Sequence, residues 1–457
     1  MLLVVILFLV FLVLSLELFY HSKFRLQTLF ISSIVFLAFI EWMAVVVLLI
    51  NICIAFLFAQ KIEKDKWKDV WFFVGIALIL FQLIGIKWWA GNISFSFHWI
   101  SISIGLSFYA LQNISYLIDV RAKKIVAETN LLYFSIFNSF FPKILCGPIM
   151  KYQEFKPQLL TLSNYKEENL ISGINRFIWG LTKKIVLADH LALMVKEVFD
   201  TTEETHGFTT LIAAFIFTLQ VYIDFSSYTD MAIGISRMFG FNIPENFAYP
   251  FSSKSFTEFW RRWNITLMKW LNQHLYFPIL FVFRKNMKKA TFIAIAVTLL
   301  FSALWHGVGA TFIYWGISHI AFISIEMLLR NREIKVNKNL RAFITIAGIS
   351  FANIFFRAKD VSSAKKMMSE IFSISDFLPH DFLSGFISVF ASGGEQIDFF
   401  NFIVVMLLTL LFFVFERRIM EKLVIDKLNI TWLFFLIAIL LVFGVFSTGE
   451  EFIYARF

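Results

Sequence analysis

Residues 2–20 read LLVVILFLVFLVLSLELFY, an apolar stretch whose first charged residue is Glu17. A helix of this length crosses the hydrocarbon core of a bilayer, which is about 30 Å thick. The stretch lacks the basic start and the small-residue cleavage site of a signal peptide, so we expect it to be retained as a first span. The whole chain shares this character, because 59% of its 457 residues are hydrophobic and only 16% are charged. Soluble domains carry about 25% charged residues. The sequence therefore predicts an all-α polytopic integral membrane protein.

Further apolar stretches predict roughly ten to thirteen membrane-spanning or re-entrant helices in all, at about 20 apolar residues for a full span. The clear candidates are residues 2–20, 43–60, 69–87, 99–118, 208–235, 291–308, 311–329, 342–356, 399–415 and 431–447. Shorter or more polar candidates are residues 27–40, 131–147 and 172–195. The sequence contains no linker, low-complexity run or internal repeat, so we expect residues 1–457 to form a single domain.

The net charge of +9 comes from basic residues in short loops between the apolar stretches. Such loops are held on the cytoplasmic side of a membrane. This reading leaves no basic, aromatic-rich surface for nucleic acid, and it places the residues after 447 outside the cell. The loops contain Lys23, Arg25, Lys61, Lys64, Lys66, Lys68, Arg121, Lys123, Lys124, Arg284, Lys285, Lys288, Lys289, Arg330, Arg332, Lys335, Lys338, Arg417, Arg418 and Lys422.

Polar residues interrupt the membrane pattern between residues 220 and 275. Ionisable groups at membrane depth are costly and usually line a cavity or pathway. We expect Asp224 or Asp230 to pair with Arg261 or Arg262, so that these groups shape a site rather than react. The residues expected to shape it are Asp224, Tyr228, Asp230, Arg261, Arg262 and Trp263.

A histidine lies deep in the apolar run Leu304-Trp305-His306-Gly307. Imidazole suits proton transfer near neutral pH, because its unperturbed pKa is about 6.5. The glycine after it would let a substrate approach the backbone closely. The same chemistry fits a packed structural histidine equally well, and for His319 we favour that structural role.

The sequence lacks the residue patterns that several other reaction classes require. The two cysteines, Cys53 and Cys146, stand in apolar runs without metal-ligand spacing, so we expect no metal site and no disulfide framework. The sequence has no G-x-S-x-G elbow, no P-loop and no HExxH motif. These absences argue against a serine hydrolase, an NTPase and a zincin.

Five stretches between about residues 97 and 360 resemble the membrane-bound O-acyltransferase family, in its bacterial alginate and peptidoglycan O-acetyltransferase branch. The longest is VYIDFSSYTDMAIGISRMFGFNIPENFAYPFSSKSFTEFWRRWNITLMKWLNQHLYFP, residues 221–278. The others are IGLSFYALQNISYLIDV (104–120), FFPKILCGPIMKYQEFKPQL (140–159), NRFIWGLTKKIVLAD (175–189) and LWHGVGATFIYWGISH (304–319). The resemblance implies a fold of transmembrane and re-entrant helices around a central tunnel or funnel.

The resemblance also implies roles for individual residues. His306 matches the active-site histidine of the LWHG motif and would act as general base. Asn264 matches the second position of the family's pair, where alginate-type members have histidine in RRWHIS. An asparagine cannot be a base, but it can orient an imidazole or bond an oxyanion. A further departure follows Tyr276-Phe277-Pro278, where Ile279-Leu280 replaces the usual Gly-Gly.

The chain ends Phe452-Ile453-Tyr454-Ala455-Arg456-Phe457, which resembles the FxYxxF tail of systems that acylate envelope polymers. A phenol, with a pKa near 10, is a better leaving group than a sugar hydroxyl. Tyr454, flanked by Phe452 and Phe457, would therefore serve as an acyl relay on the periplasmic side.

The resemblance implies a bacterial inner-membrane enzyme that moves an acetyl group from cytoplasmic acetyl-CoA to peptidoglycan or an exopolysaccharide. Lys183 and Lys184 would hold the CoA phosphates, although they fit a positive-inside role equally well. The implied partners are membrane lipids, a glycan acceptor and a periplasmic serine-type (SGNH-like) O-acetyltransferase.

Two alternatives remain at this stage. One is transfer of D-alanine or another acyl group to teichoic acid, lipid or protein; that branch usually carries the tail on a separate small protein. The other is a transporter or flippase of envelope precursors, with Asp224, Asp230 and His306 as a proton relay. The absence of internal repeats argues against the transporter.

Overall fold

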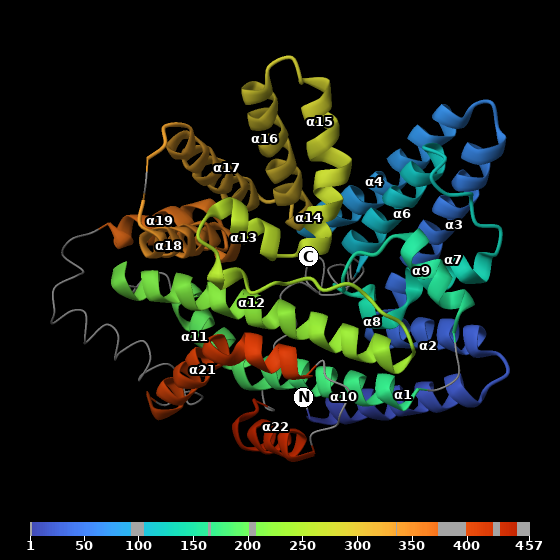
Figure 1. The fold of residues 1–457 in the computed structure, drawn as a ribbon, viewed down its shortest axis with the longest axis horizontal. Helices are drawn as coiled ribbons and strands as arrows, with labels where there is room; N and C mark the ends of the chain where they lie inside the picture. The colour runs from blue at the N-terminus through green and yellow to red at the C-terminus, as the bar shows by residue number, and fades with distance from the viewer. Residues whose placement is uncertain are drawn as a thin grey trace.

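The computed structural model describes residues 2–92, 105–162, 166–200, 207–334, 336–372, 399–423 and 430–445. Every regular element in these ranges is helical (Figure 1). Seven of the described helices are long and apolar enough to cross a membrane. They are Leu3–His21, Trp42–Lys64, Lys68–Lys87, Thr209–Met238, Met287–His306, Ala310–Asn331 and Lys338–Arg357. Each coincides with a span predicted from the sequence, so the all-α, multi-pass membrane architecture is confirmed.

Three of the N-terminal helices are joined by a chain of side-chain amides. The N-terminal helices are α1 (Leu2–His21), α2 (Arg25–Ile40), α3 (Trp42–Lys64), α4 (Lys68–Asn92) and α6 (Leu106–Arg121). Asn113 on α6 donates to Asn51 on α3 over 2.6 Å, and Asn51 donates to Gln82 on α4 over 2.6 Å. Gln82 then donates to the carbonyl of Val47 over 3.0 Å. Polar side chains inside a membrane bundle find partners on neighbouring helices. These hydrogen bonds connect α3, α4 and α6.

The stretch 131–147, predicted as one short span, is broken in the structure. It forms α7 (Leu131–Ser139) and α8 (Phe141–Ile144), separated at Phe140, whose backbone is not helical. Pro142 accounts for the break, because within a continuous helix its ring would clash with the carbonyl four residues earlier. The chain then continues into α9 (Tyr152–Leu160).

The most intimate helix pair is α10 (Glu167–Thr182) with α12 (Gly207–Met238), which lie side by side across Figure 1. Between them in sequence come a π-helical segment, η1 (Lys183–Ala188), and α11 (Asp189–Asp200). A Cβ atom on Gly234 would lie 2.6 Å from the carbonyl oxygen of Gly173. A Cβ on Gly180 would lie 2.6 Å from the carbonyl oxygen of Ser227. Small residues let membrane helices approach this closely.

We expect Gly234→Ala to destabilise the protein by about 1–3 kcal/mol, because the added methyl overpacks the α10–α12 contact. Gly85→Ala on α4 is the matched control, since a Cβ there meets nothing within 4 Å. The control should be neutral or slightly stabilising, because alanine favours helix more than glycine does. Thermal unfolding of both variants in detergent tests the point, and equal melting temperatures would contradict it.

The second half of the chain wraps around α12. It contains η2 (Pro250–Ser252), α13 (Phe256–Arg262), α14 (Ile265–Leu271), η3 (Asn272–Tyr276), α15 (Phe277–Val282), α16 (Met287–His306), α17 (Ala310–Asn331), α18 (Lys338–Arg357), α19 (Val361–Ile371), α21 (Phe399–Leu423) and α22 (Ile430–Phe443). Helices α11, α18 and α19 contact α12, and α16 and α17 form an antiparallel pair above it in Figure 1. The polar residues of α12 are therefore surrounded by protein, where ionisable groups at membrane depth are tolerated.

Candidate active site

His306 is the last residue of α16, and its side chain is 4% exposed. Its ring packs edge-to-face against three aromatic rings, Trp305 at 4.8 Å, Trp315 at 5.3 Å and Phe356 at 5.2 Å between centroids. The next residue, Gly307, has extended backbone and ends the helix. A Cβ there would lie 2.3 Å from the ring of Phe312, so the space beside this glycine is filled by the protein's own side chain.

Trp305 holds the end of α16 against two other helices. Its indole donates to the carbonyl of Ser107 on α6 over 3.2 Å. Lys87, at membrane depth on α4, donates to the carbonyl of Trp305 and lies 5.8 Å from its ring. A lysine beside the candidate base was not selected from the sequence, although a single cation at the end of an apolar span is the signal that would have identified it.

Asn264 lies in the left-handed backbone region, with φ 43°, where it caps α14. Asparagine tolerates this conformation better than most residues. The connection is clamped by Asn246, whose carbonyl accepts from the Ile265 amide over 2.9 Å and whose side-chain oxygen accepts from Thr266. Asn264 is 2% exposed, and its side-chain oxygen has no hydrogen-bond partner among the described residues.

A small aromatic chamber with about 20 Å³ of free space is lined by residues that contact His306 and by the residue that precedes Asn264. Trp315 and Phe356, which contact His306, form part of its wall, and Trp263, the neighbour of Asn264, forms another part. His319, which is 1% exposed, also lines it. The structure therefore brings four of the sequence-selected residues, His306, Asn264, Trp263 and His319, to or beside one chamber.

Asn353 on α18 fixes the wall of the chamber. Its side-chain oxygen accepts from the indole of Trp315 over 3.2 Å, and its amide donates to Thr218 on α12 over 3.1 Å. These bonds satisfy the amide and lock the indole that contacts His306. Asn353 was not selected from the sequence, where it is one polar residue in an apolar helix.

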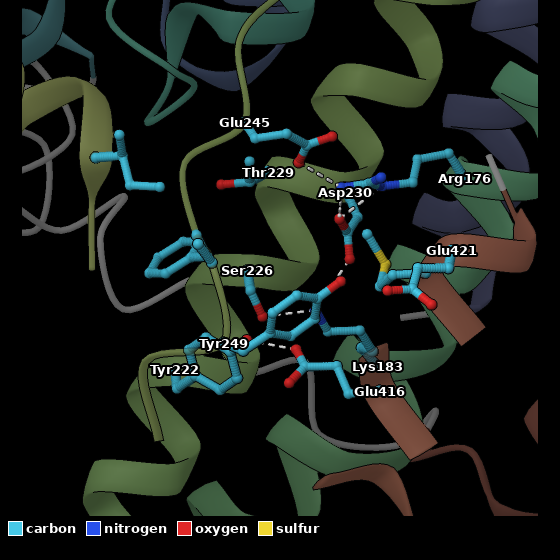
Figure 2. A pocket seen from close by; sticks show the side chains of 14 residues that line it. Arg176, Lys183, Tyr222, Ser226, Thr229, Asp230, Glu245, Tyr249, Glu416 and Glu421 are labelled. Carbon is cyan, nitrogen blue, oxygen red and sulfur yellow. Dashed lines mark hydrogen bonds and ion pairs between the residues drawn. The ribbon is translucent and has the colours of Figure 1, made fainter. Parts of the chain in front are cut away.

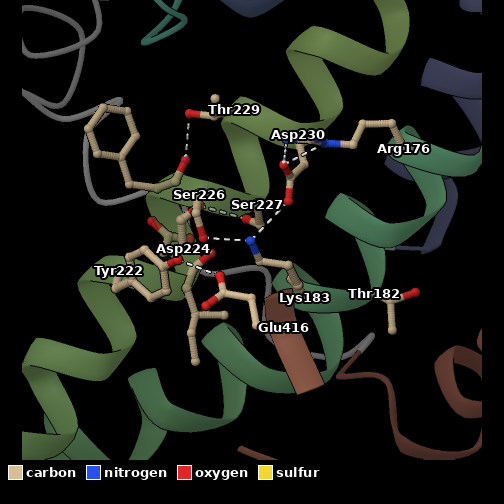
Figure 3. Close-up of polar contacts among 12 residues, drawn as sticks. Arg176, Thr182, Lys183, Tyr222, Asp224, Ser226, Ser227, Thr229, Asp230 and Glu416 are labelled. Atoms are coloured by element: carbon tan, nitrogen blue, oxygen red, sulfur yellow. Dashed lines mark hydrogen bonds and ion pairs between the residues drawn. The ribbon is translucent and has the colours of Figure 1, made fainter. Parts of the chain in front are cut away.

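A buried ion network joins α10 and α12 (Figure 3). Arg176 donates to Asp230 over 2.7 Å and pairs with Glu245 over 2.7 Å. Lys183 bonds Asp230 over 2.9 Å and Ser226 over 2.6 Å. Arg176 and Lys183 are spaced two helical turns apart, so they lie on one face of α10 and η1. That spacing is the sequence signal that would have selected Arg176.

Lys184, the residue after Lys183 in η1, bonds two further acids. Lys184 bonds Asp224 on α12 and Asp189 on α11, both over 2.8 Å. Two consecutive lysines thus reach two different carboxylates of α12, in a π-helical segment of a kind often found at functional sites. Both ammonium groups are compensated by carboxylates inside the protein. The role of Lys183 and Lys184 in holding CoA phosphates stays a prediction.

The expected pairing of Asp224 or Asp230 with Arg261 or Arg262 is wrong. The acids bond cations of α10 and η1, as above. Arg262 pairs with Glu258 on its own helix over 2.8 Å, and Arg261 is exposed. The backbone amide of Lys254 and the Arg262 guanidinium hold the pKa of the Glu258 carboxyl below its usual range, against a smaller opposing effect of burial. The pair therefore remains charged at neutral pH.

A polar cavity of about 450 Å³ opens beside the ion network (Figure 2). Its charged lining consists of Asp230, Glu245, Glu416 and Glu421 with Arg176 and Lys183. Glu416, from α21, accepts a hydrogen bond from the hydroxyl of Tyr222 on α12. The volume falls within the range of about 300–1,000 Å³ that is usual for small-molecule sites. With four carboxylates against two cations, the cavity does not attract a phosphate by charge.

Trp263 separates the polar cavity from the aromatic chamber. Its ring lies 5.9 Å from Tyr222 and 5.3 Å from Phe247, both of which line the cavity. Trp263 itself lines the chamber. Tyr228, also expected to shape the site, donates to the carbonyl of Pro142 over 3.0 Å and holds α8 against α12. Phe452, Tyr454 and Phe457 of the tail lie outside the described residues.

Comparison with known proteins identifies the framework that carries this site. The chain is 36% identical over 287 residues to a protein described as probable alginate O-acetylase AlgI from Azotobacter vinelandii; the match covers 62% of this chain and 56% of the relative. It is 33% identical over 385 residues to a protein of the same description from Pseudomonas fluorescens, covering 80% and 74% of the two chains. A peptidoglycan O-acetyltransferase from Helicobacter pylori is 29% identical over 389 residues, covering 74% and 72%.

The chain thus spans just over half the length of the first of these relatives. The family model of the membrane-bound O-acyltransferases matches residues 26–361, which include α16, α12 and every residue of the aromatic chamber. That match covers well over half of the chain. The chain therefore belongs to the membrane-bound O-acyltransferase family.

Proposed function

We propose that this protein is a membrane O-acyltransferase that uses cytoplasmic acetyl-CoA to O-acetylate a polysaccharide of the bacterial cell envelope, either peptidoglycan or an exopolysaccharide. The observation that carries the proposal is His306, a buried imidazole at the end of a membrane helix beside a small aromatic chamber. The names of the relatives support acetyl as the transferred group and a glycan as its acceptor. The enzyme would reside in the inner membrane.

In this mechanism His306 is the general base. It takes the proton of the attacking hydroxyl as the hydroxyl oxygen forms a bond to the acyl carbon. The carbon–sulfur bond to CoA then breaks, and the proton passes from His306 to the departing thiolate. Asn264, buried with an unsatisfied side-chain oxygen, would orient His306 or steady the developing oxyanion through its amide.

The polar cavity and the chamber form the route in this proposal. The acyl donor would enter through the cavity, which Lys183 helps to line, and its acyl end would pass Trp263 to reach the chamber. The net negative lining of the cavity favours a pantetheine-like arm within it and places the phosphates outside it. A tunnel from the other side of the membrane would admit the acceptor.

Tyr454 would be the first acceptor, on the periplasmic side. Its phenol oxygen takes the acyl group in the step described above, and an acyl-tyrosine remains activated because phenolate leaves readily. A periplasmic serine-type O-acetyltransferase would then take the group from Tyr454 and pass it to the glycan.

We expect the purified protein in liposomes to take up radiolabel from acetyl-CoA as an alkali-labile ester, and Tyr454→Phe to lower this label to background. Tyr133→Phe, a half-buried tyrosine outside the chamber, is the matched control and should be labelled normally. Full labelling of the Tyr454 variant would end the relay proposal but leave the acyltransferase. A wild type that transfers nothing from acetyl-CoA would end the acetyl-CoA proposal.

Two other activities are separated by the same preparation. D-alanyl transfer requires an aminoacyl carrier protein and gives no label from acetyl-CoA. A transporter of envelope precursors stops when the proton gradient is dissipated and is indifferent to CoA. The chain is more similar in sequence to the O-acetylating relatives described above than to a teichoic acid D-alanyltransferase from Bacillus subtilis, at 26% identity, which favours acetyl transfer over D-alanyl transfer.

A further inference from the structure

The aromatic chamber is small. Its free space of about 20 Å³ exceeds the minimum of about 10–15 Å³ that a single water needs. Its walls come from four helices: Val221 of α12, Phe259 and Trp260 of α13, Trp315 of α17 and Ile349 of α18 are representative. Rings packed against rings leave little freedom for the walls to retreat, so the chamber discriminates by size.

Two polar groups in this wall are left without partners. His319 is 1% exposed, and neither of its ring nitrogens has a hydrogen-bond partner among the described residues. The indole nitrogen of Trp260 is in the same condition, and that side chain is 8% exposed. The two rings lie 4.9 Å apart between centroids. Buried polar groups are nearly always bonded, so a pair of orphans on one chamber calls for an explanation.

The chemistry of the pair specifies the missing partner. An indole nitrogen can only donate a hydrogen bond, and a neutral imidazole has one donor nitrogen. Two donors on one chamber suit an oxygen with two lone pairs, such as a carbonyl oxygen. Asn353, the other polar residue of the wall, already has both ends of its amide bonded. The remaining wall is apolar and suits a methyl group.

The chamber adjoins the candidate base. The indole of Trp315 lies 5.3 Å from the ring of His306 and 4.7 Å from that of His319, so it is in contact with both imidazoles. The two imidazoles are therefore no farther apart than the sum of these distances. The indole of Trp315 therefore links the chamber that His319 and Trp260 line to His306.

We propose that the chamber is the acyl-group subsite, in which His319 and Trp260 donate hydrogen bonds to the carbonyl oxygen of the acyl thioester and the aromatic walls restrict the acyl chain to acetyl. This inference rests on the proposed function and names its donor more narrowly. As the hydroxyl attacks, the carbonyl oxygen gains charge, and the two donors stabilise it. When the intermediate collapses, an electron pair of this oxygen re-forms the carbon–oxygen double bond, the carbon–sulfur bond breaks, and the negative charge leaves on the thiolate.

The size of the chamber is tested by Ile349→Ala, with Ile349→Val as the milder variant if the first does not fold. Ile323→Val on α17 is the matched control, since it is a buried isoleucine outside the chamber. One methylene changes discrimination in a hydrophobic pocket by about 10–200-fold. The ratio of kcat/KM for butyryl-CoA to that for acetyl-CoA should therefore rise at least about tenfold in the Ile349 variants and stay constant in the control. An unchanged ratio in a folded Ile349 variant overturns the size restriction.

The donors are tested by Trp260→Phe and His319→Phe, which keep an aromatic wall and remove the polar atom. Each should lower kcat for acetyl transfer by about 10²–10³-fold with little change in KM, because an oxyanion donor acts mainly in the transition state. His319→Gln, which retains a donor, should recover part of the loss. Trp270→Phe is the control; its indole bonds the carbonyl of Leu111 outside the chamber.

The possible outcomes distinguish a failure of the acyl-group subsite from a failure of the proposed acyltransferase function. If the wild type transfers no acyl group from acetyl-CoA, the proposed function fails. If the wild type is active and folded His319→Phe and Trp260→Phe match it in kcat, the function stands and the subsite is wrong. A loss that appears equally in Trp270→Phe, or that glutamine does not relieve, also contradicts the donor role.

Discussion

Replacing His306 with glutamine is expected to lower kcat for acyl transfer by about 10²–10⁴-fold, which is the usual contribution of a positioned general base. Glutamine keeps a side chain of similar reach against Trp315 and Phe356, so the protein should still fold. Because the proposed mechanism gives His306 no part in binding the donor, KM for acetyl-CoA should change little. Initial rates in liposomes at several donor concentrations provide the measurement.

His274→Gln is the matched control for that variant. His274 lies in η3, contacts the Ser115 hydroxyl at 3.2 Å, and does not line the chamber. It should keep full activity. If both variants lose activity to the same degree, or if His306→Gln remains active, His306 is a packing residue and another group must remove the proton.

Arg176→Met is expected to destabilise the protein by about 3–5 kcal/mol, the usual cost of removing one partner from a buried ion pair. The variant leaves Asp230 with Lys183 as its remaining cationic partner. Lys183 lies over the rings of Tyr222 and Phe412, which restrict how far it can move to compensate. Thermal or denaturant unfolding in detergent measures the loss.

An exposed ion pair supplies the comparison. Arg121 and Asp69 are joined over 2.9 Å on the surface, with about half of each side chain exposed. Arg121→Met should therefore cost no more than about 1 kcal/mol. In a double-mutant cycle, Asp230→Asn in the Arg176→Met background should cost much less than Asp230→Asn alone. Additive losses, or equal losses at Arg176 and Arg121, would mean that the network does not couple the two helices.

The membrane character of the fold followed directly from the sequence. Hydrophobic length alone predicts a span such as residues 43–60, because a helix of about 20 apolar residues can cross the bilayer core whichever helices pack against it. The break at Phe140 was missed because hydropathy does not register the missing amide of Pro142. That proline lies inside an apolar stretch, and only its backbone chemistry ends the helix.

The candidate site divides in a similar way. His306 and Asn264 are recognisable from local motifs, and the structure places both beside the chamber. The partners of Asp230 were predicted wrongly because ion pairing at membrane depth depends on which helices cross. That crossing is set by the contact of Gly173 with Gly234, between residues distant in the sequence. Orphaned donors such as those of His319 and Trp260 become visible only when all their neighbours are placed.

The position of Trp263 has a consequence for the energy balance of the cell. A membrane potential of 100 mV drives each elementary charge with about 2.3 kcal/mol, so any continuous column of water through a protein drains the ion gradients that cells use to make ATP. In this structure Trp263 lines the small aromatic chamber, and its ring contacts Tyr222 and Phe247 of the charged, roomy cavity. We therefore expect this indole to oppose the passage of hydrated ions from the acidic space.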